Sequence, residues 1–382
     1  AMFRRLVERC VTWRKTTIAI TALAFVAAMA AFGLVQKQFF PTANRPELII
    51  DMRLAQGASW AATDAEVRML ERWLTNNPDV AYHTSYVGAG SPRFYLPTVP
   101  ELANSNFGQV IVMTRDLDAR ERVVQALGTL FAQDFEAVRA RVQRLQNGPP
   151  VSYPVMFRVL GDDPQQVREV AERVRRVFKA DPATRDVNFD WNEHAKAVRL
   201  EVDQAKARAL GVSSQSVADA SRSVMTGTAI GQYREGDKLI DILLRQPLDE
   251  RDALSDLAMA NLPTASGRYV PLTQVAQPQF GWEPGVMWRE GRSFAITVQG
   301  DVAEGFQPAT VTNQLLPKLR ELEATWPLGY RLHVAGAVEE SAKGSSSIAA
   351  GVPVMLFLIF TLLMLQLHSF SRSVLVFLTG PL

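Results

Sequence analysis

The sequence predicts an α+β membrane protein in which transmembrane helices flank a large exported region of strands and helices. Two apolar runs, 16–35 and 348–367, contain no Asp, Glu, Lys, Arg or His. A helix of about 20 residues crosses the hydrocarbon core of a bilayer, so each run is long enough to be a span. Between the runs, some segments alternate with period two and others repeat with a helical period, which indicates mixed strands and helices.

The charges outside the apolar runs predict the topology. Basic residues and one histidine flank the runs on their outer sides: Arg4, Arg5, Arg9, Arg14 and Lys15 before the first, His368 and Arg372 after the second. Because cytoplasmic flanks are enriched in Lys and Arg, both outer ends are expected in the cytoplasm and the region between them is expected to be exported. A signal peptide cleaved after Ala28-Met29-Ala30 is disfavoured, since the apolar run is long for one and a second span follows.

The two apolar runs predict where the chain enters and leaves the membrane. Residues 1–15 are expected to be a cytoplasmic flank, and 16–36 and 348–367 to be transmembrane helices. The apolar segment 373–382 is too short to cross a bilayer and is interpreted as the start of a truncated transmembrane helix. Because Ala1 also precedes Met2, the sequence is interpreted as an excerpt of a larger membrane protein.

Composition excludes several classes of function. Lys and Arg number 41 against 39 Asp and Glu, so the chain lacks the basic surplus of a nucleic-acid-binding protein. The single cysteine, Cys10, precedes the first run, which leaves the exported region without disulfides or thiolate chemistry. The sequence shows neither a Walker motif nor a nucleophile with its base and orienting residue, so we expect no enzyme and no cofactor.

The exported region begins with elements in the order β-α-β-β-α-β, which is the ferredoxin-like order. Strands are expected at 47–54, 80–87, 107–114 and 138–145. One helix is expected between the first two strands, with Thr63 and Glu66 as a candidate capping box, and another at 118–131.

A second unit of the same kind is divided in the sequence. A strand at 154–160, a helix capped by Asp163 and a strand at 186–190 supply its first half. Its second half follows only at 294–299, 308–322 and 330–334, so a separate α/β insert is expected between the halves. Within this insert, 231–244 is expected to be a hairpin with an exposed polar turn formed by Arg234, Glu235, Gly236 and Asp237.

Short signatures occur along the whole chain in a fixed order: Phe39-Phe40-Pro41, Gln56-Gly57-Ala58-Ser59, Val202-Asp203-Gln204, Ala209-Leu210-Gly211-Val212, Gly267, Val270-Pro271-Leu272, Gly336, Glu339-Glu340-Ser341 and Ser369-Phe370-Ser371. With the divided second unit, they resemble the C-terminal half of a resistance-nodulation-division (RND) multidrug efflux transporter of the hydrophobe/amphiphile type, from its seventh transmembrane helix onward. The resemblance extends over essentially the whole chain.

The resemblance implies that the exported region is divided into two porter subdomains and a docking subdomain. Residues 37–150 are similar to a periplasmic porter subdomain, and 151–194 with 284–336 are similar to a second, split porter subdomain. Residues 195–283 are similar to the docking subdomain, which would bring Arg234, Glu235, Gly236 and Asp237 to a partner protein.

The resemblance also implies the function. Such transporters are multi-pass proteins of the bacterial inner membrane, act as homotrimers or heterotrimers, and export drugs and other small amphiphilic substrates by proton antiport. A periplasmic membrane fusion protein and an outer-membrane channel complete the tripartite complex. The resemblance also implies that the ionisable residues that couple protons lie in other spans of the transporter, and both apolar runs of this sequence are uncharged.

The same resemblance identifies a candidate substrate site. The glycine-rich segment Val87, Gly88, Ala89, Gly90, Ser91 and Pro92 stands where the family has its switch loop, and glycine gives such a loop conformational freedom. Arg93, Phe94 and Tyr95 offer a charge and two aromatic surfaces, while Thr84, Tyr86 and Ile111 match wall positions on the neighbouring strands. A plain loop between strands, with aromatic residues packed on the domain edge, is the alternative.

Three other functions remain open from the sequence, one of which is a protein-translocation accessory of the same superfamily. An RND-type heavy-metal exporter is suggested by Met52, Met113 and Met156, although single methionines in strands more often fill a core. Asp190, Glu193 and His194 are interpreted as a solvated turn, so no metal site is expected. A two-span periplasmic sensor or receptor is the third alternative.

Overall fold

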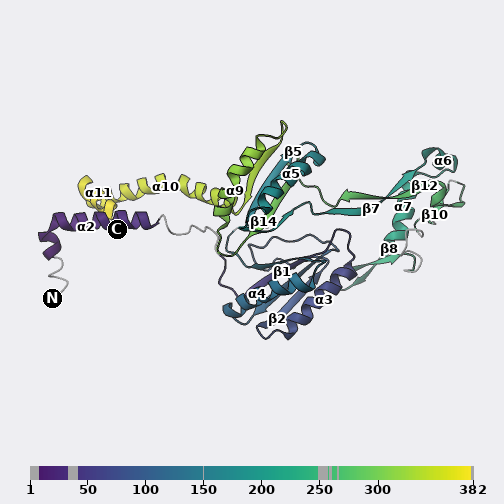
Figure 1. Ribbon diagram of the computed structural model, residues 1–382, viewed down its shortest axis with the longest axis horizontal. Coiled ribbons are helices and arrows are strands. Elements are labelled where there is room, and N and C mark those ends of the chain that lie inside the picture. Colours follow the sequence, from purple (N-terminus) through teal and green to yellow (C-terminus); the bar gives the residue numbers. More distant parts are fainter. Residues whose placement is uncertain are drawn as a thin grey trace. The chain divides into compact units, whose positions relative to one another are not determined.

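Figure 1 shows the computed structural model of the chain, which describes residues 8–32, 42–148, 150–247, 257, 260–264 and 266–379. The Phe39-Phe40-Pro41 signature and the last residues of the segment 373–382 lie outside the described residues. The chain divides into two compact units, one formed by Ala1–Asn192 with Val286–Leu382 and the other by Glu193–Gly285. The expected insert, 195–283, lies within the second unit.

Two of the described helices are long and apolar enough to cross a membrane, by length and composition alone. One is α2 (Arg14–Phe32), and the other is the 31-residue helix α10 (Ala337–Leu367). The α10 helix begins well before the apolar run at 348, because it continues directly from the preceding strand. A shorter apolar helix, α11 (Phe370–Thr379), follows after His368, which adopts a left-handed conformation.

The first sheet contains β1 (Glu47–Arg53), β2 (Val80–Val87), β3 (Phe107–Thr114) and β4 (Arg139–Arg144) in the antiparallel order β2-β3-β1-β4. Helices α3 (Trp60–Asn76) and α4 (Leu117–Asp134) provide the apolar side chains that pack on one of its faces. The fully buried core includes Leu48, Ile50 and Met52 of β1 with Leu70 and Leu127 of the helices. The strands predicted here are confirmed, with shifts of one residue at some ends.

The predicted capping box is wrong. Helix α3 begins earlier, at Trp60, and the side chain of Ser59 accepts the capping hydrogen bond from the backbone N–H of Ala62. Thr63 therefore lies inside the first turn, where it is fully buried, and its hydroxyl donates to the carbonyl oxygen of Ser105 at 2.6 Å. The prediction failed because Thr63 has the residue type of a cap but follows the true cap within the helix.

The second sheet unites the two separated halves of the divided unit. Its strands are β5 (Val155–Gly161), β6 (Thr184–Phe189), β13 (Arg289–Glu290), β14 (Ser293–Val302) and β15 (Arg331–Gly336), in the order β13-β14-β5-β15 with β6 also paired to β14. The pairing of β14 with β5 joins residues more than a hundred positions apart, for example Val298 with Phe157.

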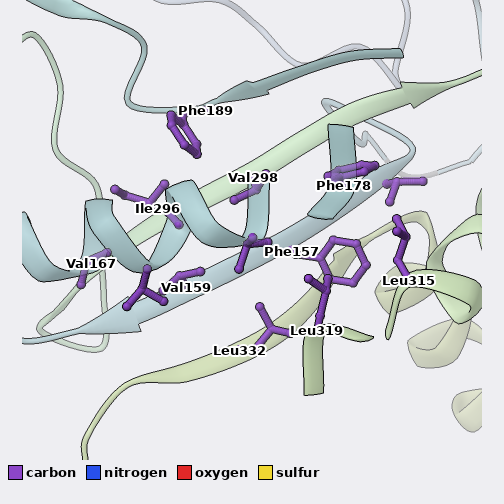
Figure 2. Close-up of a cluster of buried hydrophobic side chains, with 14 of the residues drawn as sticks. Phe157, Val159, Val167, Phe178, Phe189, Ile296, Val298, Leu315, Leu319 and Leu332 are labelled. Atoms are coloured by element: carbon purple, nitrogen blue, oxygen red, sulfur yellow. The ribbon is translucent and has the colours of Figure 1, made fainter. Parts of the chain in front are cut away.

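Helices α5 (Pro164–Lys179) and α9 (Pro308–Glu323) provide the apolar side chains that pack against this second sheet. Asp163 caps α5 as expected, and its carboxylate accepts from the N–H of Gln166 at 2.8 Å. Figure 2 shows the core, in which Phe157 and Val298 of the strands lie against Phe178 and Leu319 of the helices. Phe157 and Phe178 meet edge to face with ring centroids 5.7 Å apart.

The second unit has its own small core and three two-stranded sheets among the described residues. Its elements are β7 (His194–Val202), α6 (Gln204–Ala209), α7 (Ser214–Met225), β8 (Thr228–Glu235), β9 (Lys238–Leu244), β10 (Asn261–Pro263), β11 (Tyr269–Pro271) and β12 (Ala276–Pro284). The hairpin formed by β8 and β9 turns at Gly236, whose φ of 63° suits glycine.

Candidate functional site

A cleft of about 520 Å³ lies within the first unit, between polar faces of its two sheets. Strand alternation creates the first face, because Leu48, Ile50 and Met52 point into the core and the residues between them point away. Cross-strand pairing then aligns Asp51 of β1 with Gln109 of β3 and Arg141 of β4. The second sheet contributes residues of the same alternating kind: Met156, Arg158, Asp186, Asp190, Thr297 and Gln299.

Arg141 joins the two faces. Its guanidinium binds both carboxylate oxygens of Asp301 on β14, at 2.6 and 2.8 Å, and lies over the ring of Tyr153 at 3.8 Å. Burial by itself lowers the pKa of Arg141, but the Asp301 carboxylate raises it above its ordinary value. Arg141 is therefore charged under all ordinary conditions, and the bidentate geometry fixes the position of β4 beside β14.

Asp51 lies at the centre of the first face. One carboxylate oxygen accepts a hydrogen bond from the Nε2 of Gln109 at 2.8 Å, and the other accepts from the Nε2 of Gln143. Burial raises the pKa of Asp51, partly offset by the hydrogen bond from Gln109 and by the charge of Arg141. Both oxygens are occupied by amides, so this carboxylate is held as a structural acceptor.

Asp190 and Trp191 contradict the interpretation of their segment as a solvated turn. Trp191 is 1% exposed, and its indole N–H donates to the carbonyl oxygen of Ala295 at 2.7 Å. The carboxylate of Asp190 accepts from the backbone N–H of Thr297 at 2.9 Å and lines the cleft. Burial raises the pKa of Asp190 to about 6.

The loop between β2 and β3, residues 88–106 and here called the β2–β3 loop, borders the cleft. Gly88 donates its N–H to the carbonyl oxygen of Phe107 at 2.8 Å and accepts from the N–H of Asn104 at 2.9 Å, which closes the stem of the loop. Gly88 has a φ of 81°, a conformation that favours glycine, whereas Gly90 has no positive φ. Gly90 is instead closely packed, because an added Cβ would lie 3.0 Å from the Cβ of Glu101.

Only some of the predicted site residues line the cleft. Ser91, Arg93 and Tyr95 do so. The guanidinium of Arg93 donates to the carbonyl oxygen of Leu96, and the hydroxyl of Tyr95 donates to the Oδ1 of Asn147 at 3.0 Å. Among the other predicted switch-loop residues, Val87 packs on the core of the first sheet and Pro92 is exposed.

The remaining predicted residues lie elsewhere on the same structure. The three predicted wall residues, Thr84, Tyr86 and Ile111, lie on β2 and β3. Thr84 pairs with Ile111 and Tyr86 pairs with Gln109, so all three are on the same sheet face as Ile49 and Asp51. They do not line the cleft. Phe94 is 45% exposed and does not line the cleft. The predicted docking residues Arg234, Glu235, Gly236 and Asp237 form the exposed turn of the β8–β9 hairpin.

The described part of the chain contains no group of three or more His, Cys, Asp or Glu residues that could hold a metal ion. Of the methionines considered, Met52 is fully buried in the core and Met156 lines the cleft. Sequence reasoning missed Asp51, Gln109, Arg141 and Asp190 as cleft residues. The period-two pattern could have marked their strand faces as polar, but it does not tell which other surface they meet.

Comparisons with known proteins give relatives whose names refer to metal ions. The chain is 20% identical to the cobalt-zinc-cadmium resistance protein CzcA of Cupriavidus metallidurans, 23% to the nickel and cobalt resistance protein CnrA of the same species, and 21% to the cation efflux system protein CusA of Escherichia coli. These alignments cover 99%, 93% and 100% of this chain and 37%, 34% and 36% of the relatives.

The fold also matches a solved structure. A crystal structure of a heavy metal efflux pump superposes with a TM-score of 0.75 at 19% identity, over 98% of this chain and 39% of that protein. The chain thus spans well under half the length of the relatives that it matches. The sequence profile of the AcrB/AcrD/AcrF family matches residues 1–382, and this chain therefore belongs to that RND transporter family.

Proposed function

We propose that this chain forms part of an RND efflux transporter in the bacterial inner membrane, and that its two-sheet unit forms part of the periplasmic substrate path. The match of the family over the whole chain carries this proposal. The position of the cleft supports it, because the β2–β3 loop borders an open space between two separately supported sheets. Residues 37–150 would be one porter subdomain, and 151–194 with 284–336 the other.

Metal cations are the first candidate substrates. The sequence by itself favoured drugs and other amphiphiles, but CzcA, CnrA and CusA are all named for metal ions or cations. The names of these relatives therefore support the heavy-metal alternative better than the multidrug interpretation. In the cleft, Met156 and the carboxylates of Asp186 and Asp190 are the groups that could contact a passing cation.

Amphiphilic organic compounds are the second candidate, because the lining of the cleft favours them. The cleft lining contains more basic than acidic side chains: Arg53, Arg93, Arg139, Arg141, Arg144 and Arg158 against Asp51, Glu101, Asp186 and Asp190. Tyr95 and Trp288 add aromatic surface to the same lining. Because Arg53, Arg141, Arg144 and Arg158 are each paired with a carboxylate, the cleft suits a solute with a polar group and an apolar body.

The partner proteins that we propose are those of the RND family. The exposed β8–β9 hairpin would dock a periplasmic membrane fusion protein or an outer-membrane channel, within a trimer of identical or related chains. Proton antiport would be supplied by residues outside the two apolar runs, 16–35 and 348–367, since neither run contains an ionisable side chain.

A susceptibility panel on a strain that lacks the complete gene tests the proposal. Salts of cobalt, zinc, cadmium, nickel, copper and silver form one arm, and detergents, dyes and amphiphilic drugs form the other. Sensitisation to metal salts that the complete gene reverses supports cation export, whereas sensitisation only in the second arm supports organic substrates. Unchanged growth in both arms at normal expression of the complemented gene contradicts the proposed function.

A further inference from the structure

The β2–β3 loop is attached to the first sheet through a side-chain relay that starts at Asp51. The backbone N–H of Ser91 donates to the Oε1 of Gln109 at 2.8 Å, and the Nε2 of the same glutamine donates to the Oδ1 of Asp51 at 2.8 Å. Gln109 is only 7% exposed, so both bonds are shielded from competing water. A single amide therefore connects a loop backbone atom with a half-buried carboxylate.

Gln143 is a control for Gln109, because it also binds Asp51 but does not bind the loop. It lies on β4, on the opposite side of β1 from β3, and donates to the other oxygen of Asp51. Both glutamines thus satisfy the same carboxylate, but Gln109 is the one that also accepts from Ser91. Substituting each glutamine in turn therefore separates the effect of removing a hydrogen bond to Asp51 from the effect of releasing the loop.

The other end of the loop has a second attachment to β1. Glu101 binds Arg53 with 3.0 Å between the Nη2 of Arg53 and the Oε2 of Glu101, and the arginine also lies over the ring of Phe107. Asp51 and Arg53 are two residues apart on one strand and therefore point to the same face. The segment between Ser91 and Glu101 is consequently held at both ends, by Gln109 of β3 at Ser91 and by Arg53 of β1 at Glu101.

We propose that Gln109 is a positioning residue of the cleft, which fixes the first half of the β2–β3 loop by bridging the Ser91 N–H to Asp51. The link from loop position to substrate access rests on the proposed function, but the bridge itself does not. Glutamine suits this position because its amide presents an acceptor to the loop and a donor to the carboxylate at once. Leucine offers neither group, and glutamate offers acceptors only.

Hydrogen–deuterium exchange of the full-length transporter in detergent tests the bridge. In Gln109→Leu, peptides that cover residues 88–98 should exchange about tenfold faster than in the wild type, since the loop loses its buried acceptor. In the control Gln143→Leu, the same peptides should stay within about twofold of the wild type. Equal exchange of these peptides in both variants, whether slow or fast, overturns the proposal.

An exchange of partners gives a test that does not depend on how well the leucine variant folds. Gln109→Glu by itself places two carboxylates against each other and should release the loop. The double variant Gln109→Glu with Asp51→Asn restores a donor and an acceptor at the two positions. The side-chain NH2 of the asparagine at 51 can donate to the carboxylate at 109, and this carboxylate can still accept from the N–H of Ser91. The side-chain oxygen of the asparagine can still accept from Gln143. Loop exchange should return to within about twofold of the wild type, and failure of this rescue contradicts the relay.

A transport readout on the same variants links the bridge to the cleft. Resistance at normal membrane abundance should drop in Gln109→Glu and recover in the double variant. If exchange follows the expected pattern while no metal salt or amphiphile depends on the complete gene, the bridge stands and the proposed function fails. If resistance depends on the gene but exchange shows no specific effect of residue 109, the proposed function stands and the bridge fails.

Discussion

Gly88 shows how one backbone angle limits the changes that the β2–β3 loop can accept. Its φ of 81° is unfavourable for any other residue, and an added Cβ would meet the Cδ1 of Trp60 at 2.8 Å. Gly88→Ala should therefore reduce the free energy of unfolding by about 1–3 kcal/mol, and thermal unfolding of the purified transporter measures this.

Gly90→Ala is the matched comparison at the same loop. Its strain comes only from the 3.0 Å approach to Glu101, so a smaller loss of stability is expected. An equal loss in both alanine variants would show that the conformation of Gly88 is not the deciding factor. A proline at position 88 would be less informative, because it also removes the backbone N–H that donates a hydrogen bond to the carbonyl oxygen of Phe107.

Asp190 should give the protein a specific dependence on pH. Because burial raises its pKa to about 6, the folded state binds more protons than the unfolded state between the ordinary aspartate pKa and that value. Its contribution to stability is therefore largest in acid and is lost as pH rises toward about 6, by about 3 kcal/mol in all.

Asp190→Asn is the matched variant, since its side-chain oxygen can still accept from Thr297. The difference in melting temperature between this variant and the wild type should grow between about pH 4 and about pH 7 in favour of the variant. A constant difference over this range would contradict the assignment.

At the level of residues, the sequence predicted the loop better than the cleft. The resemblance named Gly88, Ser91 and Tyr95, glycine and serine favour a turn there, and their role as a site stays a prediction. Gln109 and Arg141 carry no such signal, since a polar residue on an alternating strand has the same pattern whether it faces water or another sheet.

Among the structural elements, β4 and β14 are joined by the ion pair of Arg141 and Asp301. Their side chains are 12% and 30% exposed, so removal of one partner leaves a charge with little solvent around it. Arg141→Leu should reduce the free energy of unfolding by about 3 kcal/mol. The double variant Arg141→Leu with Asp301→Leu should recover part of this loss, and calorimetry of the four proteins gives the coupling energy. Strict additivity of the two changes would contradict a direct pair.

The β8–β9 hairpin should contact a partner protein, because every residue of both strands is exposed. A two-stranded hairpin is barely stable by itself in water, and this one displays large apolar side chains: Ile230, Tyr233, Leu239, Ile240, Ile242, Leu243 and Leu244. Glu235→Cys should crosslink to a fusion protein or channel in cells, whereas Thr264→Cys in the same unit serves as the control. Crosslinks absent from Glu235→Cys, or equal at both positions, would refute the docking role.

Element types were predictable where periodicity was strong. The amphipathic pattern of α5 and the alternation of β1 gave these elements almost to the residue. The residue-by-residue pairing of β5 with β14 could not be derived from the pattern itself, because strand register depends on contacts between distant segments.

For the whole molecule, the proposed transporter should assemble as a trimer. Native mass spectrometry of the full-length protein in mild detergent should show three subunits, since the family organisation implies subunit contacts through the exported region. A single subunit at every concentration would contradict this. Loss of the trimer on deletion of residues 231–244 would show that the hairpin takes part in assembly.

Gly336 has a mechanical consequence for the molecule. This residue ends β15 and begins α10 with φ 78° and ψ −148°, a conformation available essentially to glycine alone. The 31-residue helix is about 46 Å long, so a tilt of about 5° about Gly336 would displace its far end by about 4 Å. Gly336 lies against Met156 of the cleft face, with 3.2 Å from an added Cβ to the methionine Cγ. Any tilt of α10 would therefore rotate the backbone beside Met156 by only the same few degrees.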